Sequence, residues 1–551
     1  MFPEKKAMND SRADMILING NIVTVNQENE IAEAVAIKCS RILRVGSNEE
    51  IKPLADEHTE VIDLDGKTVV PGLIDTHVHY CDDGVATIRE VDVRTHVVGS
   101  IKELLEKIRE RAETTPKGKW IIGHGSPGQD LKFEEKRFPT RWELDGVTTE
   151  HPVTIHCGAH INIANSLALE LGGITKDTPD PEGGWIVKDH ETGEPTGVLR
   201  ETAKYLVWRN IPEPTVEEYR KGILIGADEV LKSGTTTLHD IVTRPEALRA
   251  YFELRREGKL PLRFRLLVRV IESKTTLEPL LKLGVITGLG DEWLQIGGVK
   301  MSIDGGITGR NAAFSAGYAD QPGHHGVIRI PQELLEETIL EAHKGGLQCH
   351  VHAIGDIAHE MTFKAFEKAL KEYPREDHRH RVEHLGQWCF DESQRKRTKE
   401  MGLIPLPNPS VLAGMGEFLV SCLGPEICKD LYPFKTMLEE GFRFSIGSDA
   451  PGYWPVNPLR DAWAAVTHKT EHGNVVSPQE RITPEQALRL ITIDAAWVGF
   501  EEDVKGSIEP GKLADLVVLP EDPLKISPDT VKSLEPEITI LDGKIAFEKK
   551  Q

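Results

Sequence analysis

Short apolar runs alternate with amphipathic runs through the middle of the chain, the pattern of parallel strands joined by crossover helices. The runs at 333–346 and 364–374 repeat apolar residues at helical spacing and predict helices. Eight strand-like runs lie between such stretches, at 69–79, 235–241, 264–271, 296–304, 347–355, 380–386, 402–407 and 442–450. This pattern predicts an α/β fold with a TIM-like (β/α)8 barrel over 71–502, whose active site lies at the C-terminal ends of the strands.

Both ends of the chain carry a different pattern, in which short strand-like runs are separated by tight-turn dipeptides. Asn19–Gly20 and Asp65–Gly66 near the start, and Asp542–Gly543 near the end, are typical of hairpins. We therefore expect a small β-sandwich domain built from both termini, residues 1–70 plus 503–551.

The connection between the first two predicted strands is far longer than one crossover helix requires. Its central part, residues 95–215, carries elements of its own. They are a helical run at 100–113, strand-like runs at 120–125 and 152–157, and a loop rich in Gly and Pro at 178–199. We interpret 95–215 as an insertion near the barrel mouth that covers the site.

Composition and charge limit which partners and which cellular compartment we expect. Hydrophobic residues make up 39% and charged residues 28%, as in ordinary soluble proteins, and the net charge of −22 argues against a nucleic-acid partner. The seven cysteines form no Cys-x-x-Cys pair, which argues against a disulfide framework and a thiolate zinc site. Neither a signal peptide nor an apolar stretch of membrane-spanning length is present. We expect a cytoplasmic protein with no membrane partner.

The sharpest chemical signal is His77-Val78-His79, at the end of the first predicted strand. Side chains at i and i+2 of a strand point the same way, so both imidazoles can bind one divalent cation. A bare His-x-His is more often a pair of surface histidines. Its position after an apolar strand headed by Pro-Gly favours a metal site.

Three further candidate ligands, His352, His384 and Asp449, lie near the ends of later predicted strands. Each alone is more often a structural residue. Together with the first pair they give four histidines and an aspartate at one end of one barrel, a ligand set for hard or borderline divalent metals, zinc first.

Lys300 stands in the apolar fourth predicted strand. A buried lysine is unfavourable unless it is paired or chemically changed. An ion pair with Asp304 or a neighbouring carboxylate explains Lys300 as well as a role at the metal site does, and the residues alone leave both open.

Six motifs carry a resemblance to a known family. They are PGLIDTHVH, GGVKMSIDGGITGR, HVHAIGDIAHE, RVEHLGQ, GSDAP and GSIEPGKLADLVVL. In this order the chain resembles the amidohydrolase superfamily, and specifically its amidohydrolase-3 branch of N-substituted formamide deformylase-like enzymes, over residues 12 to about 545. Segments 151–170 and 181–201 also resemble the inserted region of that branch.

The resemblance implies a binuclear metal centre, with zinc expected and other divalent metals possible. The implied ligands are His77, His79 and Asp449 for the first metal, His352 and His384 for the second, and Lys300, carboxylated on its side-chain nitrogen, as the bridge. His350 lies one step deeper in its strand, and we expect it to pack in the core or support a ligand. Asp75 and Asp304 are candidates to fix the orientation of an imidazole.

Further residues are candidates to bind the substrate. They are Arg310, His160, Trp185, His239, His325 and Trp454. Arg310 is suited to clamp a substrate oxygen or carboxylate. Trp185, with Ile161 and Ile186, would supply apolar walls. The branch often has Asp-Gly-His where this chain has Gly-Ala-His at 158–160. This departure weakens the case for carrying a role in the branch over to His160.

The resemblance implies hydrolysis of a C–N amide bond in a small N-acyl or N-substituted amide. In that mechanism a metal-bound hydroxide attacks the carbonyl, and a second cation polarises it. Asp449 takes up the proton and passes it to the leaving amine.

Several alternatives share these residues. A lactonase, an ester hydrolase or a cyclic-imide hydrolase would use the same ligands. A deaminase typically has one metal and no bridging lysine, and a non-catalytic binding or regulatory homologue typically lacks one or more ligands. The expected partners are a small-molecule substrate and a second copy of the chain in a homodimer.

Overall fold

The computed structural model describes residues 12–95, 97–126, 128–158, 161–181, 183–270, 277–425, 427–428, 431–452 and 454–550. The chain divides into two compact units. Residues up to Cys81 and from Ile223 onward form the first, called here the barrel unit, and Asp82–Gly222 forms the second, called the inserted unit.

Seven parallel strands form the central sheet of the barrel unit. In spatial order they are β8 (Leu73–Val78), β15 (Thr235–Val242), β16 (Arg263–Arg269), β17 (Leu294–Ser302), β18 (Cys349–His352), β19 (Arg381–Glu383) and β20 (Ile404–Leu406). Each strand lies beside the next one in the chain, in parallel register. This order and direction are those of a TIM-like barrel, with all C-terminal strand ends at one edge.

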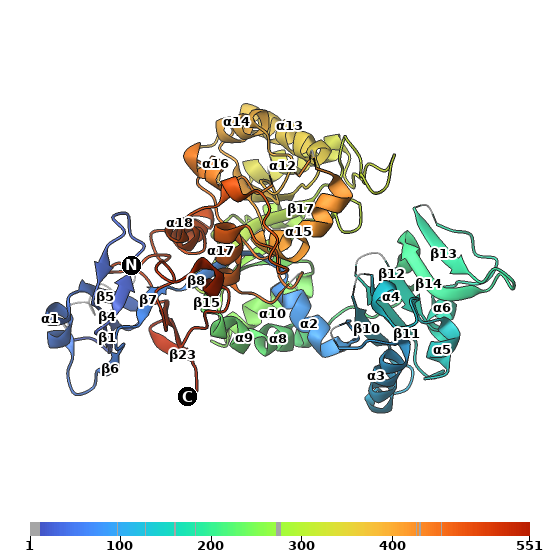
Figure 1. Cartoon of the computed structure of the whole chain (residues 1–551), viewed down its shortest axis with the longest axis horizontal. Coiled ribbons are helices and arrows are strands. Elements are labelled where there is room, and N and C mark those ends of the chain that lie inside the picture. The colour runs from blue at the N-terminus through green and yellow to red at the C-terminus, as the bar shows by residue number, and fades with distance from the viewer. Residues whose placement is uncertain are drawn as a thin grey trace. The chain divides into compact units, whose positions relative to one another are not determined.

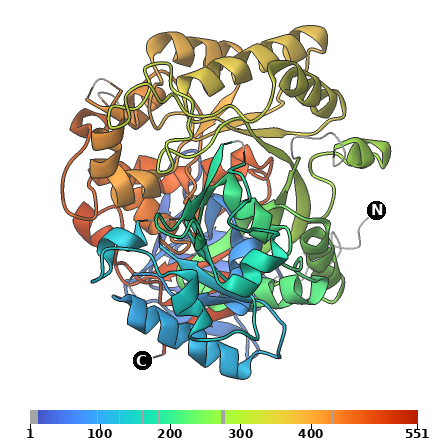
Figure 2. The ribbon, with the colours of Figure 1, turned by 90° about the vertical axis from the view of Figure 1, so that its right-hand side faces the viewer.

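Helices follow the strands because each connecting segment carries one apolar face. In α13 (Asp356–Glu372) this face buries Phe363 and Phe366. Figures 1 and 2 show α13 running beside α12 (Gln332–Lys344). The other helices here are α9 (Ala227–Lys232), α10 (Pro245–Arg256), α11 (Leu277–Lys282), α14 (Glu392–Glu400), α15 (Pro409–Leu423), α16 (Phe434–Glu439), α17 (Pro458–Thr467), α18 (Pro484–Leu490) and α19 (Ile493–Val498). Within the described ranges, no helix combines the length and the apolar character needed to cross a membrane.

Two predicted strands differ from the structure. The run 69–79 is divided at Gly72, which lies so close to Thr236 that a Cβ would meet its Oγ1 at 2.4 Å. The first part becomes β7 (Thr68–Pro71) of another sheet and the second part becomes β8. Residues 442–449 form no regular strand. This segment lies along β8 through a single parallel bridge, Val78 to Ala450, and its extended conformation ends at Asp449, whose φ is +57°.

The two ends of the chain form two further sheets. One contains β5 (Arg41–Gly46), β4 (Ala34–Lys38), β1 (Met15–Ile18) and β6 (Glu60–Asp63), and the other β23 (Lys544–Glu548), β22 (Ile538–Leu541), β21 (Leu516–Leu519), β7, β2 (Asn21–Val23) and β3 (Ile31–Ala32). Leu17 and Val35 of the first sheet share a hydrophobic cluster with Val69 and Leu516 of the second. The β-sandwich arrangement of these sheets stays a prediction.

The inserted unit has a six-stranded sheet of its own. Its strands, in spatial order, are β13 (Gly184–Lys188), β14 (Pro195–Glu201), β12 (Ile161–Ala164), β11 (Val153–Cys157), β10 (Ile121–Gly125) and β9 (Glu90–Asp92). Helix α3 (Ile101–Thr114), capped by Ser100, shares a hydrophobic cluster with one face of this sheet. The unit contains the predicted segment 95–215 and extends to residues 82 and 222. Its predicted place near the barrel mouth stays a prediction.

Candidate metal centre

Two histidines and an aspartate meet at the C-terminal end of β8. His77 is on β8 and His79 follows it, so their side chains lie on the same side of the chain. The Nε2 atoms of both imidazoles lie 3.4 Å from Oδ1 of Asp449. The backbone brings Asp449 there, since its N–H donates to the carbonyl of His77 at 2.9 Å. Gly447 permits this approach, because a Cβ at that position would meet the Cβ of His77 at 2.8 Å. The three residues predicted for the first metal therefore form one group.

His352 and His384 lie beside this group. His352 ends β18 and His384 follows β19, the neighbouring strand. Their ring centroids are 4.5 Å apart, and that of His384 is 5.1 Å from that of His77. Burial lowers the pKa of His384 to about 3 and holds that of His352 well below its usual value. Both rings are thus neutral, the form in which imidazole binds metals.

Lys300 is buried on β17, and its Nζ has no hydrogen-bond partner in the described structure. Burial lowers its pKa to about 8, although the charges of Glu383 and Asp449 raise it. The alternative of an ion pair with Asp304 is not supported, because that carboxylate accepts three backbone N–H groups of neighbouring segments. Lys300 therefore places an unsatisfied nitrogen beside charged groups of the centre.

Glu383 holds the His77 ring, a role that sequence reasoning missed. The Nδ1 of His77 is hydrogen bonded to Oε2 of Glu383, and its Nε2 faces Asp449. Arg381 binds the same carboxylate through Nε at 2.9 Å and Nη2 at 3.1 Å. Burial raises the pKa of Glu383, but the charges of Arg381 and its other neighbours outweigh this and hold it well below its usual value. The available sequence signal was an Arg and a Glu on one face of a short buried strand directly before His384.

Three other residues, Asp75, Asp304 and His350, were candidates to support the ligand imidazoles, and each makes a different contact. Asp75 accepts the backbone N–H of His77 at 3.2 Å and does not bond a ring, so its predicted role on an imidazole is wrong. Oδ1 of Asp304 lies 3.6 Å from Nε2 of His352, slightly beyond hydrogen-bond distance. His350 is buried with its Nδ1 3.5 Å from the carboxylate that holds His77, in keeping with a packing or supporting role.

Arg310, predicted to clamp substrate, is engaged by its own neighbours. It forms an ion pair with Asp320, and its Nη1 donates to the carbonyl of Thr308 at 2.8 Å. Its guanidinium lies 4.6 Å from the centroid of the Phe418 ring. A substrate carboxylate would have to compete with Asp320, and the role of Arg310 stays a prediction.

Two predicted pocket histidines have structural partners. His239 is buried on β15, and its Nδ1 accepts a hydrogen bond from Nη1 of Arg381 at 3.1 Å. It therefore belongs to the buried network that ends at Glu383. Nδ1 of His325 is 3.0 Å from the carbonyl oxygen of Phe314.

The two predicted tryptophans belong to different units of the chain. Trp454 is buried in the barrel unit, with the guanidinium of Arg460 4.3 Å from its ring centroid. Trp185 lies on β13 of the inserted unit and is 56% exposed, whereas its neighbour Ile186 is buried. His160 lies outside the described residues.

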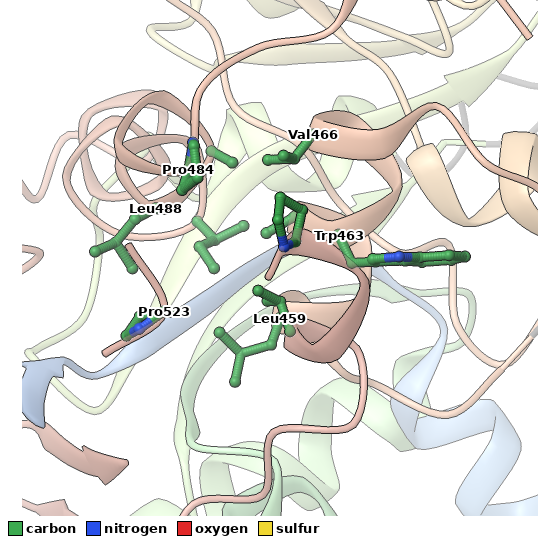
Figure 3. A pocket seen from close by; sticks show the side chains of 11 residues that line it. Leu459, Trp463, Val466, Pro484, Leu488 and Pro523 are labelled. Atoms are coloured by element: carbon green, nitrogen blue, oxygen red, sulfur yellow. The ribbon is translucent and has the colours of Figure 1, made fainter. Parts of the chain in front are cut away.

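An apolar pocket in the barrel unit is separate from these groups (Figure 3). It is lined by α17, α18 and nearby residues, among them Leu459, Trp463, Val466, Pro484 and Leu488. The predicted ligands do not line it, and a lining without charged groups offers nothing to hold a cation. It is a packing gap between helices.

A model of the amidohydrolase family matches residues 60–547. The chain belongs to this family. Protein LONG AFTER FAR-RED 3 of Arabidopsis thaliana is 31% identical to it over 525 residues, covering 92% of this chain and 87% of that protein. N-substituted formamide deformylase of Arthrobacter pascens is 30% identical over 557 residues, covering 97% and 98%. The solved structure of an uncharacterised metal-dependent hydrolase from Pyrococcus horikoshii matches with a TM-score of 0.76 at 27% identity, covering 94% of this chain and 99% of that one.

These comparisons confirm the resemblance to the amidohydrolase family and show that this chain is a hydrolytic enzyme. The fold of this chain, with its TIM-like barrel, matches that of the solved relative over 94% of the chain. The residues of the centre fit divalent cations. Burial and the charge of Lys300 lower the pKa of His77, but Glu383 and Asp449 outweigh them and raise it, and Nε2 of this ring faces the Asp449 carboxylate at 3.4 Å. A cation there would replace a proton, and Lys300 Nζ is free to carry a carboxylate group.

Proposed function

We propose that this amidohydrolase uses divalent metal ions to hydrolyse the C–N bond of a small N-acyl or N-substituted amide. His77, His79 and Asp449 would hold one ion, and His352 and His384 a second. Lys300, carboxylated on Nζ, would bridge them. Zinc is the first choice, because imidazole and carboxylate ligands suit it.

The observation that carries this proposal is the state of Lys300. Its ammonium group is buried without a hydrogen bond among the described residues, beside neutral imidazoles. A buried ammonium group without a hydrogen bond is unfavourable even beside the charges of Glu383 and Asp449, whereas a carboxylated nitrogen is an anion with two oxygens that can bind metals. The kinship with an N-substituted formamide deformylase supports the amide as substrate.

Each residue then has a defined task. Bound divalent cations would supply Lewis acidity toward the carbonyl and allow water to act as a nucleophile near neutral pH. Glu383 accepts a hydrogen bond from the Nδ1–H of His77 and so keeps Nε2 free as a ligand. Asp449 removes a proton from the attacking water and delivers it to the nitrogen as the C–N bond breaks. Water and amide thus give a carboxylic acid and an amine.

The test combines metal analysis with a substrate panel. Full-length protein is stripped with a chelator, reloaded with zinc, and assayed on N-acyl amines, N-acyl amino acids, cyclic imides and lactones. We expect chelation to abolish amide hydrolysis and zinc to restore it. Full activity in metal-free protein would overturn the metal assignment. Preference for lactones or imides over every amide would overturn the amide assignment and leave the centre intact.

A further inference from the structure

A second group of metal-binding side chains lies in the inserted unit, on its own sheet. Glu90 is on β9, His124 on β10 and His156 on β11. Oε2 of Glu90 is 2.9 Å from Nε2 of His156 and 3.4 Å from Nδ1 of His124. The two imidazole centroids are 4.6 Å apart. One carboxylate oxygen therefore faces two ring nitrogens.

The register of the sheet produces this arrangement. Strands β9, β10 and β11 are parallel neighbours, and β10 and β11 can be followed in Figure 1. His124 is directly opposite His156, and opposite Asp92 on the other side. Glu90 is two residues before Asp92, so all these side chains share one face. The opposite face carries the hydrophobic cluster that includes α3.

We propose that Glu90, His124 and His156 form a second divalent-metal site, with zinc as the preferred ion. Two histidines and one glutamate are a known zinc ligand set, and three protein ligands leave a fourth position for water or another ligand. Ligand atoms each about 2.0 Å from a tetrahedral zinc ion lie roughly 3.3 Å apart. The two distances to Glu90 Oε2 bracket this spacing, and one ligand atom from each of the three residues lies within 4.8 Å of the other two.

The charges and the exposure of the group suit a cation. Burial, with His156 as the next cause, lowers the pKa of His124 to about 4, so its ring is neutral. Burial raises the pKa of Glu90, but the hydrogen bond from His156 outweighs this, and the pKa lies below its usual value. The side chains are 16–29% exposed, which gives an ion access. The nearby Arg94 is neutralised by a 2.6 Å ion pair with Asp92.

The site is independent of the proposed amide hydrolysis, because it shares no ligand with the barrel centre. The competing explanation is a simple ion pair between Glu90 and protonated His156. That pair would require no metal and would leave His124 without a role.

The experiment counts metal in the full-length protein after loading with zinc and removal of excess. Glu90→Gln, which keeps the side-chain shape, and His124→Ala are compared with wild type. His190→Ala, an exposed histidine of the same unit, is the control. We expect each ligand variant to lose about one equivalent per chain and the control to lose none. Cobalt loading should show a matching loss of visible absorbance.

Circular dichroism and thermal unfolding establish that each variant is folded. If His124→Ala does not fold, the isosteric Glu90→Gln decides the question. Equal metal content and equal cobalt spectra in wild type and folded Glu90→Gln would overturn the proposal and leave the ion pair as the explanation. A loss in His190→Ala as large as in the ligand variants would also overturn it.

Discussion

Replacing Glu383 with glutamine is the most informative perturbation of the barrel centre. Glu383 is fully buried, accepts a hydrogen bond from His77, and is bound twice by Arg381. Glutamine keeps the shape but removes the charge. It leaves the guanidinium of Arg381 uncompensated and no longer selects the His77 tautomer whose Nε2 is free. We therefore expect Glu383→Gln to weaken metal binding and to destabilise the fold.

The expected losses of metal affinity and of folding stability can both be given a size. Residues that support a ligand imidazole typically change metal affinity about 10–100-fold, or roughly 1.4–2.7 kcal/mol. Removing one partner of a buried ion pair typically costs about 3–5 kcal/mol of folding stability. Because the amide of glutamine can still accept one hydrogen bond from Arg381, we expect the lower end, about 3 kcal/mol.

Asp515→Asn separates the two effects. Asp515 forms another buried pair, with Arg263, at 2.7 and 3.0 Å, and Arg263 also pairs with Asp542 at 3.0 Å. Arg263 begins β16, whereas Arg269 at its other end is in register with Lys300. Six strand residues span about 20 Å, so this pair is remote from the centre.

Competitive chelator titration measures the metal affinity of both variants, and denaturant unfolding measures their stability. We expect both variants to be destabilised, Asp515→Asn less because Arg263 keeps its ion pair with Asp542, and the loss of metal affinity to be confined to Glu383→Gln. Unchanged metal affinity in Glu383→Gln, or an equal loss in Asp515→Asn, would refute the positioning role of Glu383.

Three further predictions follow from the proposed centre. Lys300→Ala should be inactive and low in metal by elemental analysis, and short carboxylic acids should partly restore its activity; a plain lysine by mass analysis in wild type with two metals bound would contradict the carboxylated bridge. Asp449→Asn should retain most metal while kcat falls about 10²–10⁴-fold, since a positioned proton-transfer group contributes that much; a loss below about tenfold would assign proton transfer to another residue. Arg310→Ala should raise KM mainly for amides that carry a carboxylate, and Trp185→Ala should weaken the binding of bulky apolar amides. Unchanged substrate selectivity in both variants would exclude these residues from the substrate pocket.

The barrel was predictable because buried parallel strands are near-continuous apolar runs that survive in the sequence. Seven of the eight predicted runs overlap a strand of the central sheet. The eighth, 442–450, has the same apolar character, but Asp449 has a left-handed backbone and the segment joins β8 by one bridge. Apolar spacing carries no information about such a local conformation. The division of 69–79 at Gly72 was hidden for a similar reason, since it depends on contact with Thr236.

The candidate ligands were predictable because each follows or ends a strand, and the strand ends of a barrel meet at one edge. The residues that support them were not. Glu383 contacts Arg381 on its own strand β19 and His77 on β8, a strand that is not its neighbour in the sheet, so the contact with His77 depends on the three-dimensional fold. The group at Glu90 was hidden because its three members come from separate strands without a recognisable spacing.

Unsatisfied buried groups link the fold to the proposed chemistry. Lys300 Nζ and His352 Nε2 are buried without a hydrogen bond among the described residues. Each such group costs about 1–3 kcal/mol, so the pair costs roughly 2–6 kcal/mol. Asp304, equally buried nearby, has its oxygens occupied by backbone N–H groups. The fold therefore satisfies the Asp304 carboxylate next to the centre and leaves two of the six predicted ligands, Lys300 and His352, each with an unsatisfied buried atom. Metal binding would remove this cost in the native state alone, which couples occupancy of the centre to the stability of the barrel.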